Sequence, residues 1–123
     1  MAIEIETKEK YIIATPKVDK LDSSISPSLK SELVMANADG AKNIILNLQH
    51  VKYCDSSGLS AVLIGNRICR NTDGTFVICC LQDAVMNLIK ISQLDRIINL
   101  TPTLSEAEDL VILEEVGREA EEG

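Results

Sequence analysis

The sequence predicts a single α/β domain in which a mixed, mostly parallel sheet of about five strands is packed with about four α-helices. After an opening pair of strand-like segments, helix-like and strand-like segments alternate along the chain, which is typical of parallel sheets with right-handed crossovers. The opening pair makes a hairpin, so the sheet must be mixed. A length of 123 residues fits one domain, and 46% hydrophobic residues can supply its core.

The chain opens with the predicted hairpin. Residues 3–7 alternate apolar and polar side chains, as a half-buried strand does, and residues 11–15 form the second strand. Pro16 ends the pairing because proline has no amide hydrogen to donate. Residues 17–24 are expected to be a polar loop.

The start of the first helix is predicted from Ser26 and Pro27. Serine is favoured at the N-cap, and proline is favoured at the first helical position. Leu29 and Leu33 then fall on one helical stripe, and Gly40 stands where a C-terminal cap belongs.

The middle of the chain is the most regular. An apolar run over residues 44–48 predicts a central strand, and residues 57–71 predict a helix with an unusually wide apolar arc. Asn71 to Gly74 is expected to be a turn in which Gly74 supplies a positive φ. The continuous apolar run over residues 75–81 indicates a strand that is covered on both faces.

The last third is predicted as a helix over residues 82–91, a short strand over 97–100 and a final helix. Thr103 and Glu106 have the spacing of a capping box at the start of that helix. The helix is expected to stop near Gly117. The predicted domain therefore spans residues 1–117, and residues 118–123 form an acidic tail that frays.

Charge and composition exclude several classes of partner. The formal net charge is −7, which argues against nucleic acid or an anionic membrane as partner. Aromatic residues make up only 2% of the chain, which argues against a function that depends on stacking aromatic side chains on nucleic-acid bases. The first six residues lack the features of a signal peptide, and no apolar run reaches the ~20 residues of a membrane helix, so we expect a cytoplasmic protein.

The sequence gives no reason to expect a metal or another cofactor. It has a single histidine, His50, and no Cys-x-x-Cys pair, so a zinc site is not predicted. Its four cysteines are interpreted as reduced thiols packed like small hydrophobic side chains, at positions Cys54, Cys69, Cys79 and Cys80.

The stretch from Asp55 to Gly58 is the candidate functional site. It links the central strand to the second helix, so its hydroxyls and carboxylate should lie where backbone N–H groups are unpaired. A phosphoryl group on Ser56 or Ser57 would meet those donors and the positive end of the helix dipole. Gly58 is expected to let a partner's backbone approach. Simple helix capping explains the same residues without any further function.

A hydrolase is an alternative reading of the two serines. However, the sequence lacks a Gly-x-Ser-x-Gly elbow, and His50, the sole histidine base available, is expected on the surface. Gly-rich phosphate loops are also missing.

The strand over residues 44–48 followed by Tyr53-Cys54-Asp55-Ser56-Ser57-Gly58-Leu59 resembles the STAS domain, and within it the bacterial anti-sigma factor antagonists. The resemblance extends over nearly the whole chain. Leu21-Asp22 resembles the element before the first helix, and residues 84–98 resemble the third helix and the last strand.

This resemblance implies a binding module without catalysis. Its unmodified form would sequester a serine kinase that doubles as anti-sigma factor. Phosphorylation of Ser56 would break the complex, and a metal-dependent (PP2C-type) serine phosphatase would restore it. Partner contacts are expected from Asp22, Asp55, Ser57, Gly58 and Leu59. Whether Ser57 can replace Ser56 stays open, as does a STAS scaffold that is never phosphorylated and serves a signalling complex or a lipid-transport ATPase.

Overall fold

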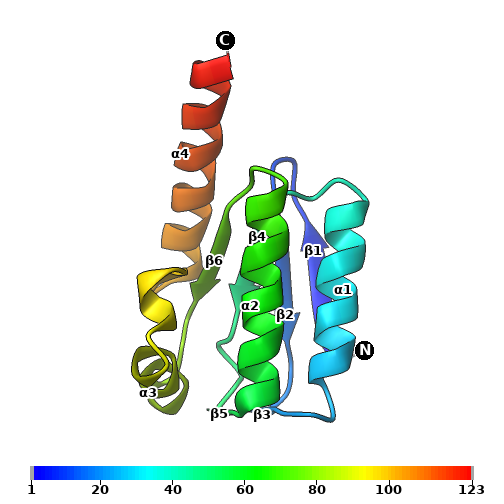
Figure 1. Ribbon diagram of the computed structural model, residues 1–123, viewed down its shortest axis with the longest axis vertical. Coiled ribbons are helices and arrows are strands. Elements are labelled where there is room, and N and C mark those ends of the chain that lie inside the picture. The colour runs from blue at the N-terminus through cyan, green and yellow to red at the C-terminus, as the bar shows by residue number, and fades with distance from the viewer. Residues whose placement is uncertain (1, 123) are drawn as a thin grey trace.

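The computed structural model describes residues 2–122 and has the predicted α/β architecture (Figure 1). One 3₁₀ turn, Leu94–Arg96, follows the third helix. The strands are β1 (Ile3–Thr7), β2 (Ile12–Pro16), β3 (Lys20–Leu21), β4 (Ile44–Asn47), β5 (Tyr53–Cys54), β6 (Phe76–Cys79) and β7 (Asn99–Thr101). The helices are α1 (Ser26–Ala38), α2 (Ser56–Asn71), α3 (Asp83–Ile91) and α4 (Leu104–Glu122).

The main sheet has five strands in the order β1-β2-β4-β6-β7. Strand β1 is antiparallel to β2, and the remaining pairs are parallel. The prediction of a mixed, mostly parallel sheet is thus confirmed. A second sheet, made of β3 and β5 in parallel, was not predicted. A strand of two residues carries no periodicity that sequence reasoning could detect.

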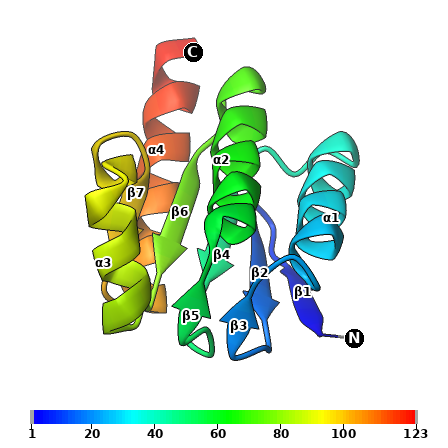
Figure 2. The same cartoon turned by 60° about the horizontal axis from the view of Figure 1, so that its bottom comes forward.

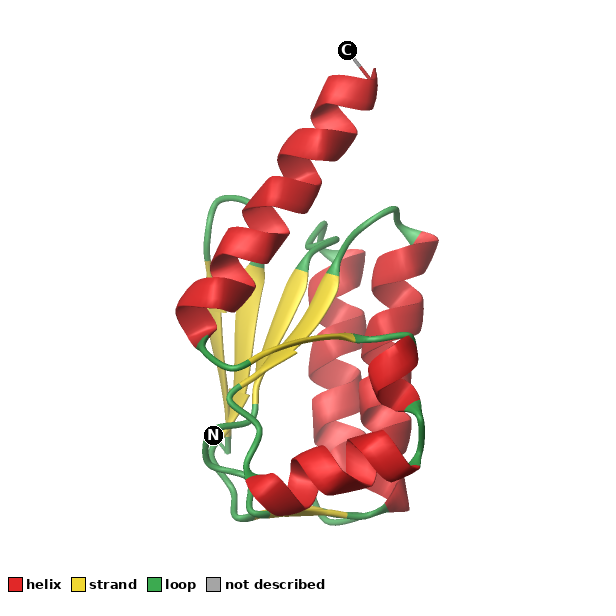
Figure 3. Cartoon of the chain, turned by 90° about the vertical axis from the view of Figure 1, so that its left-hand side faces the viewer, coloured by secondary structure: helices red, strands yellow, loops and turns green. Residues whose placement is uncertain are grey.

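The helices lie on both faces of the sheet (Figure 3). Alternation along each strand sends Ile44 and Leu46 to the face covered by α1, α2 and α3, and Ile45 to the face covered by α4. Strand β6 is buried throughout, as its continuous apolar run predicted. Within residues 2–122, none of these helices combines the length and hydropathy that crossing a bilayer requires.

The start of α1 differs from the prediction. Ile25, not Ser26, is the N-cap, and it makes no side-chain cap. Ser26 is the first helical residue, and its buried hydroxyl donates to the carbonyl of Asp22 at 2.7 Å. The N-cap prediction was wrong because this hydroxyl faces the start of α2 rather than its own helix. At the other end, Gly40 follows the helix with φ 112°, as expected of a C-terminal glycine.

The turn before β6 also differs in detail. Asp73, with φ 57°, takes the positive φ that was assigned to Gly74. Gly74 is required for another reason, since a Cβ there would lie 1.6 Å from the carbonyl oxygen of Lys42. The two loops cross so closely that no side chain fits between them.

Helix α4 runs through Gly117 to Glu122, so the predicted helix end near Gly117 was wrong. That the tail from residue 118 frays stays a prediction, and Gly123 lies outside the described residues. At its start, Thr103 Oγ1 accepts from the N–H of Glu106 at 3.1 Å, as the capping box predicted. Further on, Ala107 and Val111 pack on the sheet.

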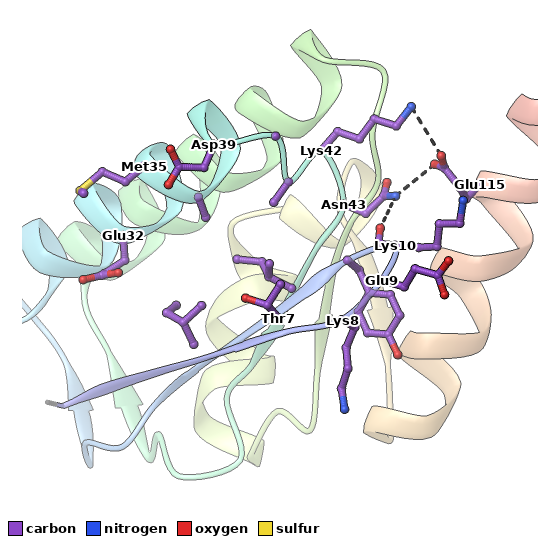
Figure 4. Close-up of a pocket in the computed structure, with 16 residues that line it drawn as sticks. Thr7, Lys8, Glu9, Lys10, Glu32, Met35, Asp39, Lys42, Asn43 and Glu115 are labelled. Atoms are coloured by element: carbon purple, nitrogen blue, oxygen red, sulfur yellow. Dashed lines mark hydrogen bonds and ion pairs between the residues drawn. The ribbon is translucent and has the colours of Figure 1, made fainter.

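A polar cluster around Glu115 fixes the second half of α4, and Figure 4 shows Glu115 with Asn43 and Lys42. Glu115 accepts hydrogen bonds from Asn43 at 3.1 Å and from Arg118 at 2.7 Å. Arg118 also donates to Asn43 and to Thr75, both at 2.9 Å. Asn43 and Thr75 stand just before β4 and β6. The cluster therefore extends the contact of α4 beyond the end of the sheet.

The carboxyl group of Glu115 titrates far below its usual range. Burial by itself would raise its pKa, but hydrogen bonds from Arg118 and Asn43, together with the charges of Lys42 and Arg118, lower the pKa to about 2. A carboxyl group with a depressed pKa stabilises the fold at any pH above its unfolded value. That contribution disappears as the pH falls through the folded value.

We predict that the free energy of unfolding of the parent falls as the pH is lowered from about 4.5 to about 2, partly through Glu115. Glu115→Gln cannot titrate, so it should be less stable than the parent at pH 7 and should lose less stability across this window. Urea titrations at a series of pH values measure both effects. Equal pH slopes for the two proteins would contradict this role of Glu115.

Two helical glycines should respond in opposite ways to the same substitution. A Cβ at Gly65 would lie 2.6 Å from the ring of Phe76, which is fully buried, whereas a Cβ at Gly117 would meet nothing within 4 Å. Gly117→Ala should therefore stabilise the domain by about 0.5–1 kcal/mol. Gly65→Ala should destabilise it, because overpacking costs about 1–3 kcal/mol. Thermal unfolding of both variants checks the pair, and a shift in the same direction would contradict it.

Candidate functional site

The candidate site lies where the small sheet meets the start of α2 (Figure 2). Strands β3 and β5 pair in register, with Lys20 beside Tyr53 and Leu21 beside Cys54. The next residue on each chain is an aspartate, Asp22 and Asp55. Residues 33 positions apart in sequence are thus brought together at the ends of adjacent parallel strands.

The carboxylate of Asp55 caps α2. Its Oδ1 accepts from the backbone N–H of Ser57 at 2.9 Å and of Gly58 at 3.1 Å, and also from the hydroxyl of Ser57 at 2.6 Å. The hydroxyl of Ser57, followed by the N–H of Gly58, lowers the pKa of Asp55. Asp55 is therefore held in its ionised form.

This cap corrects the expectation that the first N–H groups of the helix are free. Two of them, on Ser57 and Gly58, are already paired with Asp55. A phosphoryl group on Ser56 would therefore find these two donors already occupied by a carboxylate. Its charge would be presented outward rather than neutralised by the turn.

The two serines have different environments. Ser56 is the first residue of α2 and is exposed. Ser57 is half-buried: its hydroxyl contacts Asp55 and lies 3.1 Å from the hydroxyl of Ser26. Of these two neighbouring serines, Ser56 therefore offers an accessible hydroxyl, whereas the hydroxyl of Ser57 is engaged in linking α2 to α1.

Asp22 forms a local turn of its own. Its carboxylate accepts from the hydroxyl of Ser24 at 2.6 Å and from the N–H of Ser24 at 3.0 Å. These bonds lower the pKa of Asp22, while the negative charge of Asp55 acts in the opposite direction. The two carboxylates are close enough to influence each other, and both are ionised at neutral pH.

Gly58 packs closely against its own chain. It is buried, and a Cβ would lie 2.6 Å from the carbonyl oxygen of Leu21 and 2.5 Å from the sulfur of Cys54. The space that a side chain at Gly58 would need is thus filled by Leu21 and Cys54, while a partner contact at Gly58 stays a prediction. Its missing side chain lets α2 rest on the small sheet. Leu59, beside it, is half-buried and packs against the main core.

Cys54 fits the predicted packing role. Burial and the charge of Asp55 raise the pKa of its thiol to about 11, so the reactive thiolate is scarce at neutral pH. Burial likewise raises the pKa of the Cys69 thiol, to about 12. All four cysteines are free thiols.

A pocket of about 450 Å³ opens beside Asp55. Tyr53 forms part of its wall and is 60% exposed, which is unusual for an aromatic side chain. The sequence reasoning did not include Lys20 or Tyr53 in the site, because the two-residue strands that place them have no recognisable pattern. It also missed Ser26, the first residue of α1, because its contact with Ser57 joins residues 31 positions apart. The lining is completed by Lys20, Leu21, Asp22, Cys54 and Asp55.

The hydrolase alternative gains no support from the geometry. His50 is exposed, and its ring nitrogen lies 3.2 Å from the amide nitrogen of Gln49. Residues 2–122 contain no cluster of His, Cys, Asp or Glu side chains that could hold a metal ion. A second pocket of about 500 Å³ lies at the other end of the sheet, between the β1–β2 hairpin and the end of α1 (Figure 4). It contains no serine.

Removing the cap should weaken the domain. Asp55→Ala leaves the N–H groups of Ser57 and Gly58 without their acceptor, so we expect the melting temperature to fall by roughly 4 °C. Asp55→Asn should retain most of the parent's stability, since asparagine caps about as well as aspartate. Thermal unfolding of the three proteins checks the prediction, which fails if the two variants melt together.

Comparison with known proteins agrees with this geometry. The family model of the STAS domain matches residues 2–107. A protein from Thermotoga maritima described as an anti-sigma factor antagonist is similar in structure, with a TM-score of 0.82 and 22% identity over 89% of this chain and 93% of that one. The phosphorylated Bacillus cell-fate determinant SpoIIAA gives a TM-score of 0.71 and 21% identity, covering 89% and 99%.

A variant of RsbS from Moorella thermoacetica has a TM-score of 0.77 at 15% identity, covering 96% of this chain and 99% of that one. At such identities the structural matches establish a common fold. The match to the family model extends over most of the sequence, from β1 to the first turn of α4. The chain therefore belongs to the STAS domain family.

Proposed function

We propose that this protein is an anti-sigma factor antagonist, a binding module without catalysis of its own. In its unmodified form it binds a serine kinase that also acts as anti-sigma factor, and it releases that kinase when Ser56 is phosphorylated. A PP2C-type serine phosphatase returns it to the binding form. The observation that carries the proposal is the position of Ser56, exposed at the first residue of α2.

The difference between the two serines supports Ser56 as the acceptor. A kinase must reach a hydroxyl from solvent, and the hydroxyl of Ser57 is engaged with Asp55 and Ser26. Modifying Ser57 would break the link between α1 and α2. Modifying Ser56 leaves the cap in place.

Electrostatics supports release upon phosphorylation. A phosphoserine carries about −1.5 to −2 charges at neutral pH. On Ser56 this charge would stand beside the ionised carboxylate of Asp55, which already uses the nearest backbone donors. A surface that bears two carboxylates, from Asp22 and Asp55, would become far more negative. A partner fitted to the unmodified surface would then be repelled.

A scaffold that is never phosphorylated is the second candidate. The same fold and the same cap would serve a STAS subunit of a signalling complex or of a lipid-transport ATPase. The capping role of Asp55 and the packing of Gly58 are needed in either case. The two candidate functions can be distinguished by whether Ser56 carries a phosphoryl group in the host.

The test uses a serine kinase of the anti-sigma factor type from the same host, with ATP and three variants. We expect Ser56→Ala to abolish phosphate incorporation while binding to the kinase survives. Ser56→Asp should weaken binding by at least about tenfold, because like charges across an interface cost several kcal/mol. Ser57→Ala is the matched control and should still incorporate phosphate. Intact mass with site mapping and titration calorimetry provide the readouts.

Incorporation that survives in Ser56→Ala but is lost in Ser57→Ala would overturn the assignment of the acceptor. A parent that takes up no phosphate, and is purified from its host unmodified, would favour the scaffold.

A further inference from the structure

The negative charge of this protein is concentrated on one helix. Residues 104–122 contain eight acidic residues and one basic residue, a formal charge of −7. The whole chain also has a net charge of −7, so the remainder is balanced. The single basic residue, Arg118, is turned inward to Glu115, Asn43 and Thr75. Helix α4 thus faces solvent with acidic side chains.

The same helix has an apolar stripe on the side away from the sheet. Ile112, Leu113 and Val116 are 44%, 69% and 55% exposed. With the exposed Ala120 they recur at the three- and four-residue spacings that place side chains on one face of a helix. We call these four residues the α4 outer face. Three large aliphatic side chains gathered on a solvent-facing stripe mark an interaction surface.

Within residues 2–122, the fold leaves the large side chains of this face exposed. Helix α4 lies on the sheet face opposite α1 and α2, and its last turns project past the end of the sheet (Figures 1 and 3). Its inward side already packs through Ala107, Val111 and Glu115. The match to the family model ends at residue 107, before the outer face begins. The outer face therefore lies outside the segment that the family model matches.

Charge decides which partner fits. Asp109 stands three and four residues before Ile112 and Leu113, so an acidic group flanks the outer face on that side. Glu119, three residues after Val116, flanks it on the other side and forms an exposed ion pair with Lys10 at 3.2 Å. A second copy would bring acid against acid. Nucleic acid and anionic lipid would be repelled in the same way. A partner whose apolar side chains are flanked by lysine or arginine would complement both the apolar stripe and the acidic groups beside it.

We propose that the α4 outer face docks an apolar, basic helix of a partner protein. The apolar side chains of that helix would cover Ile112, Leu113 and Val116, while its cations would meet the flanking carboxylates. Gly117, where a Cβ would meet nothing within 4 Å, leaves room for a close approach beside the stripe. Because α4 and Ser56 lie at different places on the domain, this contact is separate from the switch proposed above.

The test is an NMR titration of the ¹⁵N-labelled full chain with a synthetic amphipathic helix made of leucine and lysine. Chemical-shift changes should map to residues 109–120, and affinity should fall as salt is added. A peptide with glutamate in place of lysine should not bind. The double variant Leu113→Gln, Val116→Gln keeps the charge of α4 and should bind at least about tenfold more weakly.

Met35→Gln is the matched control, because Met35 is an apolar side chain that is 60% exposed on α1. It should bind the peptide like the parent. If the double variant bound the peptide as tightly as the parent, charge alone would explain the binding and the proposal would be overturned. Shift changes confined to other elements would do the same. Dimerisation of the free chain through Leu113 and Val116, seen by sedimentation, would show that a second copy occupies the face instead.

Discussion

The carboxylate of Asp55 controls the geometry around the start of α2. By accepting from two backbone N–H groups and one hydroxyl, it fixes Ser56 as the first helical residue and directs Ser57 toward Ser26. The direction of α2 above the sheet depends on the same point, because Gly58 must pass within contact distance of Leu21. Asp55 thus sets the position of α2 and gives the hydroxyls of Ser56 and Ser57 different environments.

This arrangement separates structural from functional demands within four residues. Asp55, Ser57 and Gly58 are occupied by capping, bridging and packing. Ser56 is exposed, and none of these three roles depends on its side chain. A modification there adds charge without removing a contact on which the fold depends. The proposed phosphorylation of Ser56 is therefore compatible with the capped start of α2.

The sequence could predict the order of the elements because each long element repeats its pattern several times. The buried run before β6 and the apolar face of α2 are examples. It could not predict β3 and β5, which consist of two residues each, or the contact between Ser26 and Ser57, which are 31 positions apart. The end of α4 was misplaced because Gly117 resembles a helix stop. The contacts of Glu115 and Arg118 that hold the helix in place exist only in three dimensions.

Strand β1 is an edge strand of the main sheet. It pairs with β2 on one side and with no other described strand on the opposite side. Its residues Glu4 and Glu6 form ion pairs with Lys17 and Lys8. A strand from another molecule that tried to extend the sheet would have to align with these charged side chains, which disfavours growth into fibrils. The opening alternation of isoleucine and glutamate therefore also protects the domain against aggregation.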